Sequence, residues 1–177
     1  MTRLVLSVAL LFLTAMMSAQ TEPCSAEMAR LVRALVGDWN NTESMVASEV
    51  FPNTGERRGV LRWRLAVGGT TLVGEGNSDG SSGPLSYMLT IWWDKQAGTY
   101  YFFTCFKDTG SSCKVRGTAH WDGDSFVNDY EEIEHGKVTR WRDSFVQITP
   151  SSYKLIAARH NDDGTMTTLI TTTATRR

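Results

Sequence analysis

Acidic side chains crowd the segment between residues 129 and 143, and they are the first candidates for chemistry. Four of them are spaced like a metal cluster: Asp129, Glu131, Glu132 and Glu134. If this segment is a strand, neighbouring side chains point to opposite faces, so the four acids separate into two pairs. The three His and three Cys residues also lack the spacing of a zinc site. The sequence therefore predicts a solvated, salt-bridged face and no bound metal.

A fifth acid, Asp143, is expected to point into the protein together with Glu132. An inward carboxylate can serve as a general base, can anchor a ligand, or can form a hydrated, hydrogen-bonded pair with Asn128 on the neighbouring strand. No nucleophile stands beside a base in a recognisable arrangement. The sequence therefore favours binding over catalysis, and an enzyme that uses Asp143 or Glu132 stays open.

Two of the three cysteines flank one predicted turn, at residues 108–110. Counting outward from this three-residue loop places Phe106 opposite Ser112 and Cys105 opposite Cys113. Directly opposed residues of two antiparallel strands come close enough for a bridge. The sequence therefore predicts a disulfide between Cys105 and Cys113, with two packed thiols as the alternative.

The N-terminus has the pattern of a secretory signal peptide, residues 1–19. Arg3 precedes an apolar run from Leu4 to Met17, and we expect cleavage after Ala19. An uncleaved anchor is the alternative, but the run is short for a membrane span. The remaining residues, 20–177, then form one domain in the periplasm or outside a bacterial cell, with Cys24 as the unpaired thiol. With 18 basic and 19 acidic residues, the chain lacks the basic field of a general nucleic-acid binder.

One helix and ten strands are expected after the signal peptide. Ser25 to Val36 has an apolar stripe at helical spacing, formed by Met28, Leu31, Val32 and Leu35. Ser25 is a suitable N-cap and Gly37 a suitable stop. From Gly37 onward the hydrophobic period is two, and nine turn signals interrupt it. Because closure removes exposed edges, we predict an all-β, antiparallel up-and-down barrel with one N-terminal helix.

Turn lengths predict which residues face each other across the strands. The turn His135-Gly136 predicts outer ion pairs and inner aromatic pairs in the register Glu131–Arg140, Asp129–Arg142, Tyr130–Trp141, Asn128–Asp143 and Phe126–Phe145. A turn at Asp122-Gly123 adds basic residues to the outer rows, Lys114 beside Glu131 and Arg116 beside Asp129. Parity through the turn at Pro150 adds three residues to the inner face: Ile156, Ala158 and His160.

Turn lengths predict the inward and outward faces less clearly for Leu85 to Phe106. Parity places one set of side chains inside the barrel: Met88, Thr90, Trp92, Tyr101, Phe103 and Cys105. The other set forms an outer apolar patch: Tyr87, Leu89, Ile91, Trp93 and Phe102. An exposed patch of that size needs a cover. The helix can supply it, a second subunit can supply it in a homodimer, or the register in this segment is wrong.

Gly37-Asp38-Trp39, placed directly after the helix, resembles the opening of the calycin superfamily of lipocalin and fatty-acid-binding barrels. With Gly68-Gly69, Asp162-Asp163-Gly164 and a last strand ending in Arg176, residues 28–177 resemble a bacterial family of secreted lipocalin-like proteins. The resemblance implies that Arg176, or the arginine after it, stacks over Trp39 as a structural lock at the barrel floor.

The chain is also similar to nitrobindin, a ten-stranded barrel that holds haem through a histidine near its C-terminal strands. The resemblance implies His160 as the haem ligand. However, Asn40-Asn41-Thr42-Glu43 stands where the Gly-rich, haem-covering stretch of that family is expected. Haem through His160 is therefore an alternative, and our main expectation is no cofactor.

The predicted interior is aromatic and apolar with a few polar groups, which is the composition of a small-ligand pocket. Its predicted ligand-binding residues are Asn128, Tyr130, Trp141, Asp143, Phe145, His160, Trp92 and Thr90. We expect a small hydrophobic or amphipathic partner in a cavity larger than about 300 Å³. The alternative is a structural or interaction barrel plugged by Trp63, Trp92, Trp121 and Trp141.

Overall fold

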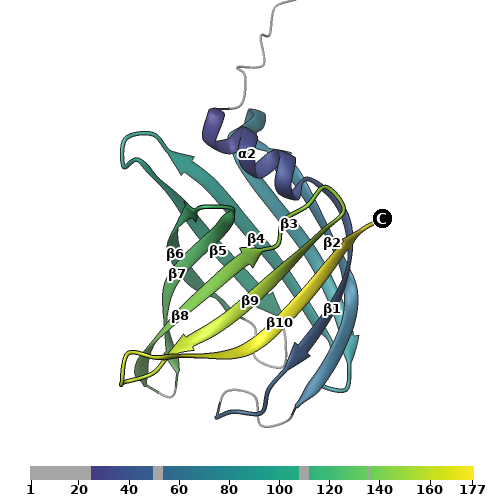
Figure 1. Ribbon diagram of the computed structural model, residues 1–177, viewed down its shortest axis with the longest axis vertical. Coiled ribbons are helices and arrows are strands. Elements are labelled where there is room, and N and C mark those ends of the chain that lie inside the picture. The colour runs from purple at the N-terminus through teal and green to yellow at the C-terminus, as the bar shows by residue number, and fades with distance from the viewer. Residues whose placement is uncertain (1–24, 50–53, 108–111, 135) are drawn as a thin grey trace, which may run out of the picture.

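The computed structural model describes residues 25–49, 54–107, 112–134 and 136–177, which form a closed barrel of ten antiparallel strands. Each strand pairs with the next in the chain, and β1 (Gly37–Met45) closes the barrel against β10 (Met166–Arg176). The helix α2 (Ala26–Leu35) lies across one end (Figure 1). The predicted all-β, up-and-down fold with an N-terminal helix is confirmed. The predicted signal peptide and Cys24 lie outside the described residues.

The other strands follow in chain order with short connections: β2 (Gly55–Ala66), β3 (Thr71–Gly80), β4 (Leu85–Asp94), β5 (Thr99–Lys107), β6 (Ser112–Asp122), β7 (Ser125–Glu134), β8 (Lys137–Val146) and β9 (Ser152–His160). A 3-10 turn, η1 (Val67–Gly69), joins β2 to β3. Across the described ranges, no helix is both long and apolar enough to cross a bilayer.

The helix α2 begins where the sequence predicts, because the Ser25 hydroxyl accepts a hydrogen bond from the Met28 backbone N–H at 3.2 Å. Its buried face consists of Met28, Leu31, Ala34 and Leu35. Ala34 thus takes the place that the apolar stripe predicts for Val32. These side chains share one core cluster with Trp39 of β1, so the helix packs on the barrel and closes that end.

The predicted lock between Trp39 and Arg176 is present at the same end. The guanidinium lies over the indole, 4.3 Å from the ring centroid, and donates a hydrogen bond to the Val36 carbonyl at 2.6 Å. The indole N–H in turn donates to the Leu35 carbonyl at 2.7 Å. Gly37 has a φ of 141°, and a Cβ there would collide with the Arg176 guanidinium, so only glycine suits this position. The lock joins the helix end to the first and last strands.

The pairing of β7 with β8 is the predicted one throughout. The register includes Phe126–Phe145, Asn128–Asp143, Asp129–Arg142, Tyr130–Trp141 and Glu131–Arg140. The outer pairs are ion pairs, at 2.7 Å for Arg142 with Asp129 and 3.0 Å for Arg140 with Glu131. The two-residue turn and the charge pattern are therefore sufficient to predict this hairpin.

The predicted pairing of β6 with β7 is wrong by two residues. The turn is Gly123-Asp124, not Asp122-Gly123, and Thr118 stands opposite Asp129. The predicted rows Lys114–Glu131 and Arg116–Asp129 are therefore not formed. Gly123 has a φ of 57°, so the turn uses its glycine at the first central position. A slip of two residues leaves each side chain on its predicted face.

A β-bulge between β5 and β6 reverses the predicted faces of β4 and β5. Phe106 is opposite Ser112, as predicted, but Thr104 is opposite Val115, so one residue of β5 faces two of β6. A single extra residue moves every side chain beyond it to the other face. The inward side chains of these strands are Tyr87, Leu89, Ile91, Trp93, Tyr100, Phe102, Thr104 and Phe106.

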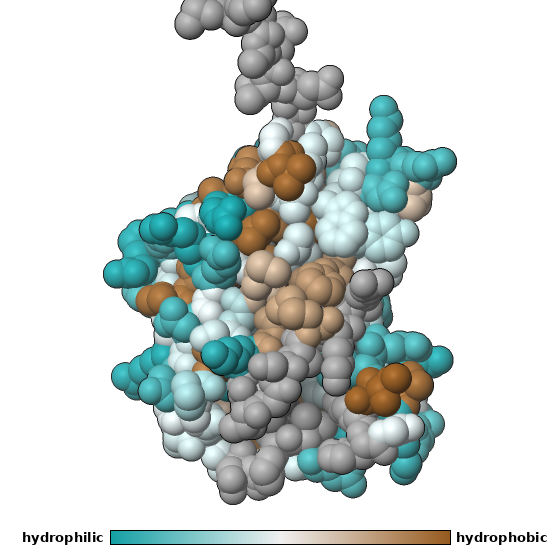
Figure 2. All heavy atoms as spheres, turned by 180° about the vertical axis from the view of Figure 1, so that it is seen from behind, coloured by the Kyte–Doolittle hydropathy of each residue, from teal (hydrophilic) through white to brown (hydrophobic). Residues whose placement is uncertain are grey.

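The predicted outer patch of Tyr87, Leu89, Ile91, Trp93 and Phe102 therefore lies inside the barrel, so these side chains do not form the outer surface on which the predicted homodimer depended. The side chains predicted inside lie outside: Met88, Thr90, Trp92, Tyr101, Phe103 and Cys105. Trp92 is 36% exposed and stacks on Tyr101 with ring centroids 5.6 Å apart. Figure 2 views the barrel from behind and shows pale and brown side chains between hydrophilic margins.

The predicted faces of β9 are also reversed. Asp143 is opposite Ala157 and Phe145 is opposite Leu155, so Ile156, Ala158 and His160 take the outward parity. The connection from β8 contains Gln147 at a φ of 52°. A positive φ is uncommon for a residue other than glycine. The sequence therefore gives no signal for the shape of this turn, and its length is misjudged by one residue.

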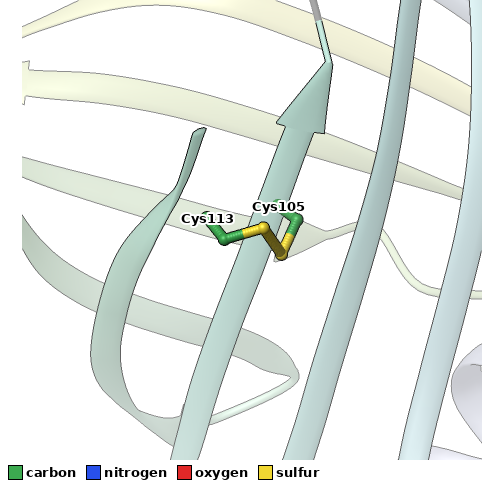
Figure 3. The surroundings of a disulfide bond; sticks show 2 residues. All are labelled: Cys105 and Cys113. Carbon is green, nitrogen blue, oxygen red and sulfur yellow. A yellow bond between two sulfur atoms is a disulfide. The ribbon is translucent and has the colours of Figure 1, made fainter. Parts of the chain in front are cut away.

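The predicted disulfide joins Cys105 of β5 to Cys113 of β6, with their Cα atoms 3.9 Å apart (Figure 3). It bridges the strands at the bulge. The predicted turn at residues 108–110 lies outside the described residues.

We predict one free thiol per chain when the unfolded, unreduced protein is titrated, because only Cys24 is left unpaired. In the chain-entropy model, a loop this short contributes about 2.5 kcal/mol to the free energy of unfolding. Reduction should therefore lower the urea midpoint, whereas Cys24→Ser should not change it. A count of three thiols would contradict the bridge.

Candidate functional site

The barrel interior is divided into a filled half and an open half. The half next to α2 is packed with buried side chains, including Trp39, Trp63, Leu72, Ile91 and Phe126. Of the predicted tryptophan plug, Trp63 and Trp141 are buried, whereas Trp92 lies outside. The other half contains a cavity of about 130 Å³. The barrel is therefore plugged at one end only.

The cavity wall is mainly apolar. Its nonpolar lining residues are Leu61, Leu85, Leu89, Phe102, Phe106, Phe145, Leu155, Ala157 and Ile170. The volume falls below the predicted lower limit of about 300 Å³ for a drug-sized pocket, so that prediction is wrong. A cavity of about 150 Å³ with such a lining is nevertheless known to hold benzene. The space therefore suits a single ring or a short chain.

A buried ion pair stands on one side of the cavity. Arg57 Nε of β2 lies 3.0 Å from Glu43 Oε2 of β1, and the side chains are only 9% and 7% exposed. The Ser78 hydroxyl donates to Glu43 Oε1 at 3.3 Å. Arg57 Nη2 also lies 3.4 Å from the sulfur of Met45. The two charges neutralise each other, so this wall is polar without a net charge.

A polar pair continues this wall toward β4. Asn41 Nδ2 donates to the Tyr87 hydroxyl at 2.9 Å. Burial, and secondarily the charge of Glu43, raises the pKa of Tyr87, so the phenol keeps its proton. Asn41 Oδ1 and Thr104 Oγ1 are buried and have no hydrogen-bond partner among the described residues. Both belong to residues that line the cavity, where a ligand can satisfy them.

The opposite wall of the cavity carries Asp143, an acid with a raised pKa. The Tyr130 hydroxyl donates to Asp143 Oδ1 at 3.3 Å. Burial is the main cause that raises the pKa of Asp143 to about 7; the Tyr130 hydrogen bond opposes the shift, and the negative charge of Glu132 adds to it. Asp143 keeps some accessible surface because it borders the cavity. This carboxyl therefore changes its charge near neutral pH.

We predict that Asp143 makes the folded protein less stable as the pH rises from about 4 to about 7. In this window the folded state holds a proton that the unfolded state, with an ordinary carboxyl pKa, has released. The loss is on the order of 4 kcal/mol and is complete above the folded-state pKa. Asp143→Asn should match the parent below about pH 4 and exceed it at about pH 8 in urea unfolding. An equal difference at both values would contradict the prediction.

The structure brings together three of the eight predicted ligand-binding residues at the cavity: Tyr130, Asp143 and Phe145. Asn128 is fully buried opposite Asp143, and neither side-chain polar atom has a hydrogen-bond partner among the described residues. No direct hydrogen bond therefore joins Asn128 to Asp143 among the described residues. Trp141 is buried and parallel to Tyr130, with centroids 6.4 Å apart.

The other three predicted residues do not line the cavity. Trp92 and Thr90 lie on the outer face of β4 because of the bulge between β5 and β6. His160 has outward parity on β9 because the preceding turn is misjudged. The sequence analysis also missed Asn41, Arg57 and Tyr87. Asn41 shares the strand parity of Trp39, which was the available signal for its inward position.

The described residues do not fit haem. The suggested ligand, His160, has the parity opposite to that of Ala157, which lines the cavity. A space of about 130 Å³ suits a group much smaller than a porphyrin. No group of three metal-binding side chains occurs in the described part of the chain.

No protein-family model matches the chain, and no curated protein matches it in sequence. The fold is similar to solved structures. Rv2717c from M. tuberculosis aligns with a TM-score of 0.59 at 11% identity, covering 86% of this chain and 98% of that one. The S-type phycobiliprotein lyase CPES from Guillardia theta aligns with a TM-score of 0.57 at 11% identity, covering 85% and 90%. At this identity the likeness establishes the lipocalin-like barrel fold alone.

Proposed function

We propose that this protein is a binding barrel for a small, largely apolar molecule. The observation that supports the proposal is the unfilled half of the barrel, where an apolar wall surrounds a few fixed polar groups. A barrel with a purely structural role has no need to leave buried polar atoms such as Asn41 Oδ1 and Thr104 Oγ1 unsatisfied beside a cavity. The volume favours a ligand with one ring or a short chain.

The proposal is tested with benzyl alcohol, an uncharged single-ring probe. Titration followed by NMR should shift resonances of the cavity-lining strands. Ala157→Phe places a ring in the cavity and should abolish these shifts, whereas Val60→Phe places the same ring at a partly exposed position on β2. Solvent extraction of the purified protein, followed by mass spectrometry, searches for a natural ligand. No probe binding and no extracted compound would contradict the proposal.

A second candidate is an enzyme that uses Asp143 as a general base in the same cavity. It is favoured by the Tyr130 hydroxyl 3.3 Å from the carboxyl and by a pKa of about 7, since a general base works best near the operating pH. In that case the ligand found by extraction should be converted by the parent protein. Asp143→Asn should still bind it but leave it unchanged.

We also propose that the protein works in the periplasm or outside a bacterial cell, as a member of the secreted lipocalin-like family that its motifs resemble. The disulfide supports this location, because such bonds persist in oxidising compartments. The full chain expressed in a bacterium should yield a mature protein that begins at Gln20 and is recovered from the periplasm or medium. A cytoplasmic protein with its first 19 residues intact would contradict the proposal.

A further inference from the structure

The charges that border the cavity do not cancel. Three charged residues line it: Glu43, Arg57 and Asp143. Glu43 and Arg57 form a buried ion pair at 3.0 Å. Asp143 remains, and its one described hydrogen-bond donor is the neutral Tyr130 hydroxyl. When Asp143 is ionised, the described residues that line the cavity therefore carry a net charge of −1.

The surroundings of Asp143 suit a cation. Tyr130 and Trp141 lie parallel beside it, with centroids 6.4 Å apart and an interplanar angle of 5°. Aromatic rings attract cations through their negatively polarised faces. Glu132 has the same inward parity as Tyr130 and adds to the negative potential at Asp143. A positively charged group in the cavity would meet the Asp143 carboxylate and the Tyr130 ring, with Trp141 packed behind that ring.

We propose that the cavity binds a small ammonium ion with an apolar body. Its nitrogen would lie at the Asp143 carboxylate and its body against the apolar wall formed by Phe145, Leu155 and Phe102. The proposal rests on the binding function above and narrows its ligand class to primary or secondary amines of about one ring in size.

A negatively charged or a neutral ligand would suit the cavity less well than an ammonium ion. A carboxylate ligand would meet the like charge of Asp143, and Arg57 is already engaged by Glu43. A neutral ligand leaves the ionised Asp143 desolvated, with no free counter-charge among the described residues that line the cavity. An ammonium group supplies that charge together with charge-assisted hydrogen bonds, which are stronger than neutral ones.

The pH dependence of binding follows from the same geometry. Binding needs an ionised Asp143 and a protonated amine, so affinity should rise about tenfold per pH unit below about pH 7 and then level off. The charged groups that face this region are Glu132 of β7, the ion pair of Glu43 and Arg57 across the cavity, and Arg159 of β9. Arg159 shares the inward parity of Ala157 and lies 4.0 Å from Glu49.

The test uses three probes with the same ring: benzylamine, benzyl alcohol and benzoate. At about pH 8, calorimetry should show benzylamine binding at least about tenfold more tightly than benzyl alcohol, with benzoate weakest. Asp143→Asn should remove the preference for the amine while keeping benzyl alcohol binding. The matched control is Glu131→Gln, which removes an exposed acid from the outer face of β7 and should change nothing.

The outcomes separate this proposal from the broader one. If benzyl alcohol binds as tightly as benzylamine, or if the preference survives in Asp143→Asn, the ammonium proposal is wrong and the binding barrel stands. If none of the three probes binds the folded parent protein, both are wrong. Should Asp143→Asn not fold, the pH profile of the parent decides, since an affinity for benzylamine that is flat between about pH 5 and 8 overturns the proposal.

Discussion

Replacing Leu31 with Asp should lower the stability of the whole barrel by more than about 4 kcal/mol. Leu31 has no exposed surface and lies in the core cluster that joins α2 to the barrel end. Losing a buried leucine costs about 1.5–3 kcal/mol, and a carboxylate in its place adds the cost of an unpaired buried polar group. The helix cannot stay folded after detaching from the barrel, because its 10 residues are too few to be stable in water without packing.

The measurement is urea unfolding followed by circular dichroism, with Arg33→Asp as the matched control. Arg33 is on the exposed side of the same helix, near its C-terminus, where an acid costs less than about 1 kcal/mol. If Leu31→Asp unfolds at the urea concentration of the control, the helix does not pack on the barrel. That result would also mean that the helix does not shield Trp39 and Arg176 from solvent.

The features that sequence reasoning predicts correctly here are those fixed by local chemistry. The Ser25 cap, the apolar stripe of α2 and the two-residue turn of the β7–β8 hairpin each depend on residues close together in the chain. The disulfide belongs to the same class, because Cys105 and Cys113 flank one short loop. In each case the nearby residues determine both the element and the pairing.

The wrong strand faces come from counting alternating inward and outward positions through places where the alternation is interrupted. The bulge opposite Cys105 shifts the predicted parity by one and reverses the predicted faces of β4 and β5. The misjudged length of the turn that contains Gln147 does the same to β9. Hydrophobic pattern does not correct the first error, since β4 and β5 carry large apolar side chains on both faces. Trp92 and Ile91 are equally plausible core residues until the packing decides between them.

The residues of the candidate site were predicted correctly only where the strand register was predicted correctly. Tyr130, Asp143 and Phe145 lie on the hairpin whose register was predicted correctly, and they line the cavity. Arg57 was missed because an arginine within a strand is usually exposed. Only the placement of Glu43 opposite it, across β1 and β2, makes its burial possible.

Glu43→Gln should cost about 3–5 kcal/mol of stability, because it leaves the Arg57 guanidinium buried without its counter-charge. Arg57→Met should be destabilising by a similar amount, since it leaves the Glu43 carboxylate unpaired. The double variant should recover most of the loss, because an apolar replacement of a buried ion pair is often close to neutral. Urea unfolding of the four proteins gives the coupling energy directly.

The exposed ion pair of Arg140 and Glu131 is the control for this cycle, and Glu131→Gln should cost less than about 1 kcal/mol. If Glu43→Gln costs no more than that, water reaches the ion pair, and its charges are not desolvated as their low exposure indicates. The double variant also separates the roles of the two acids. Asp143 keeps its charge there, so benzylamine should still bind more tightly than benzyl alcohol even though the opposite wall has lost both of its charges.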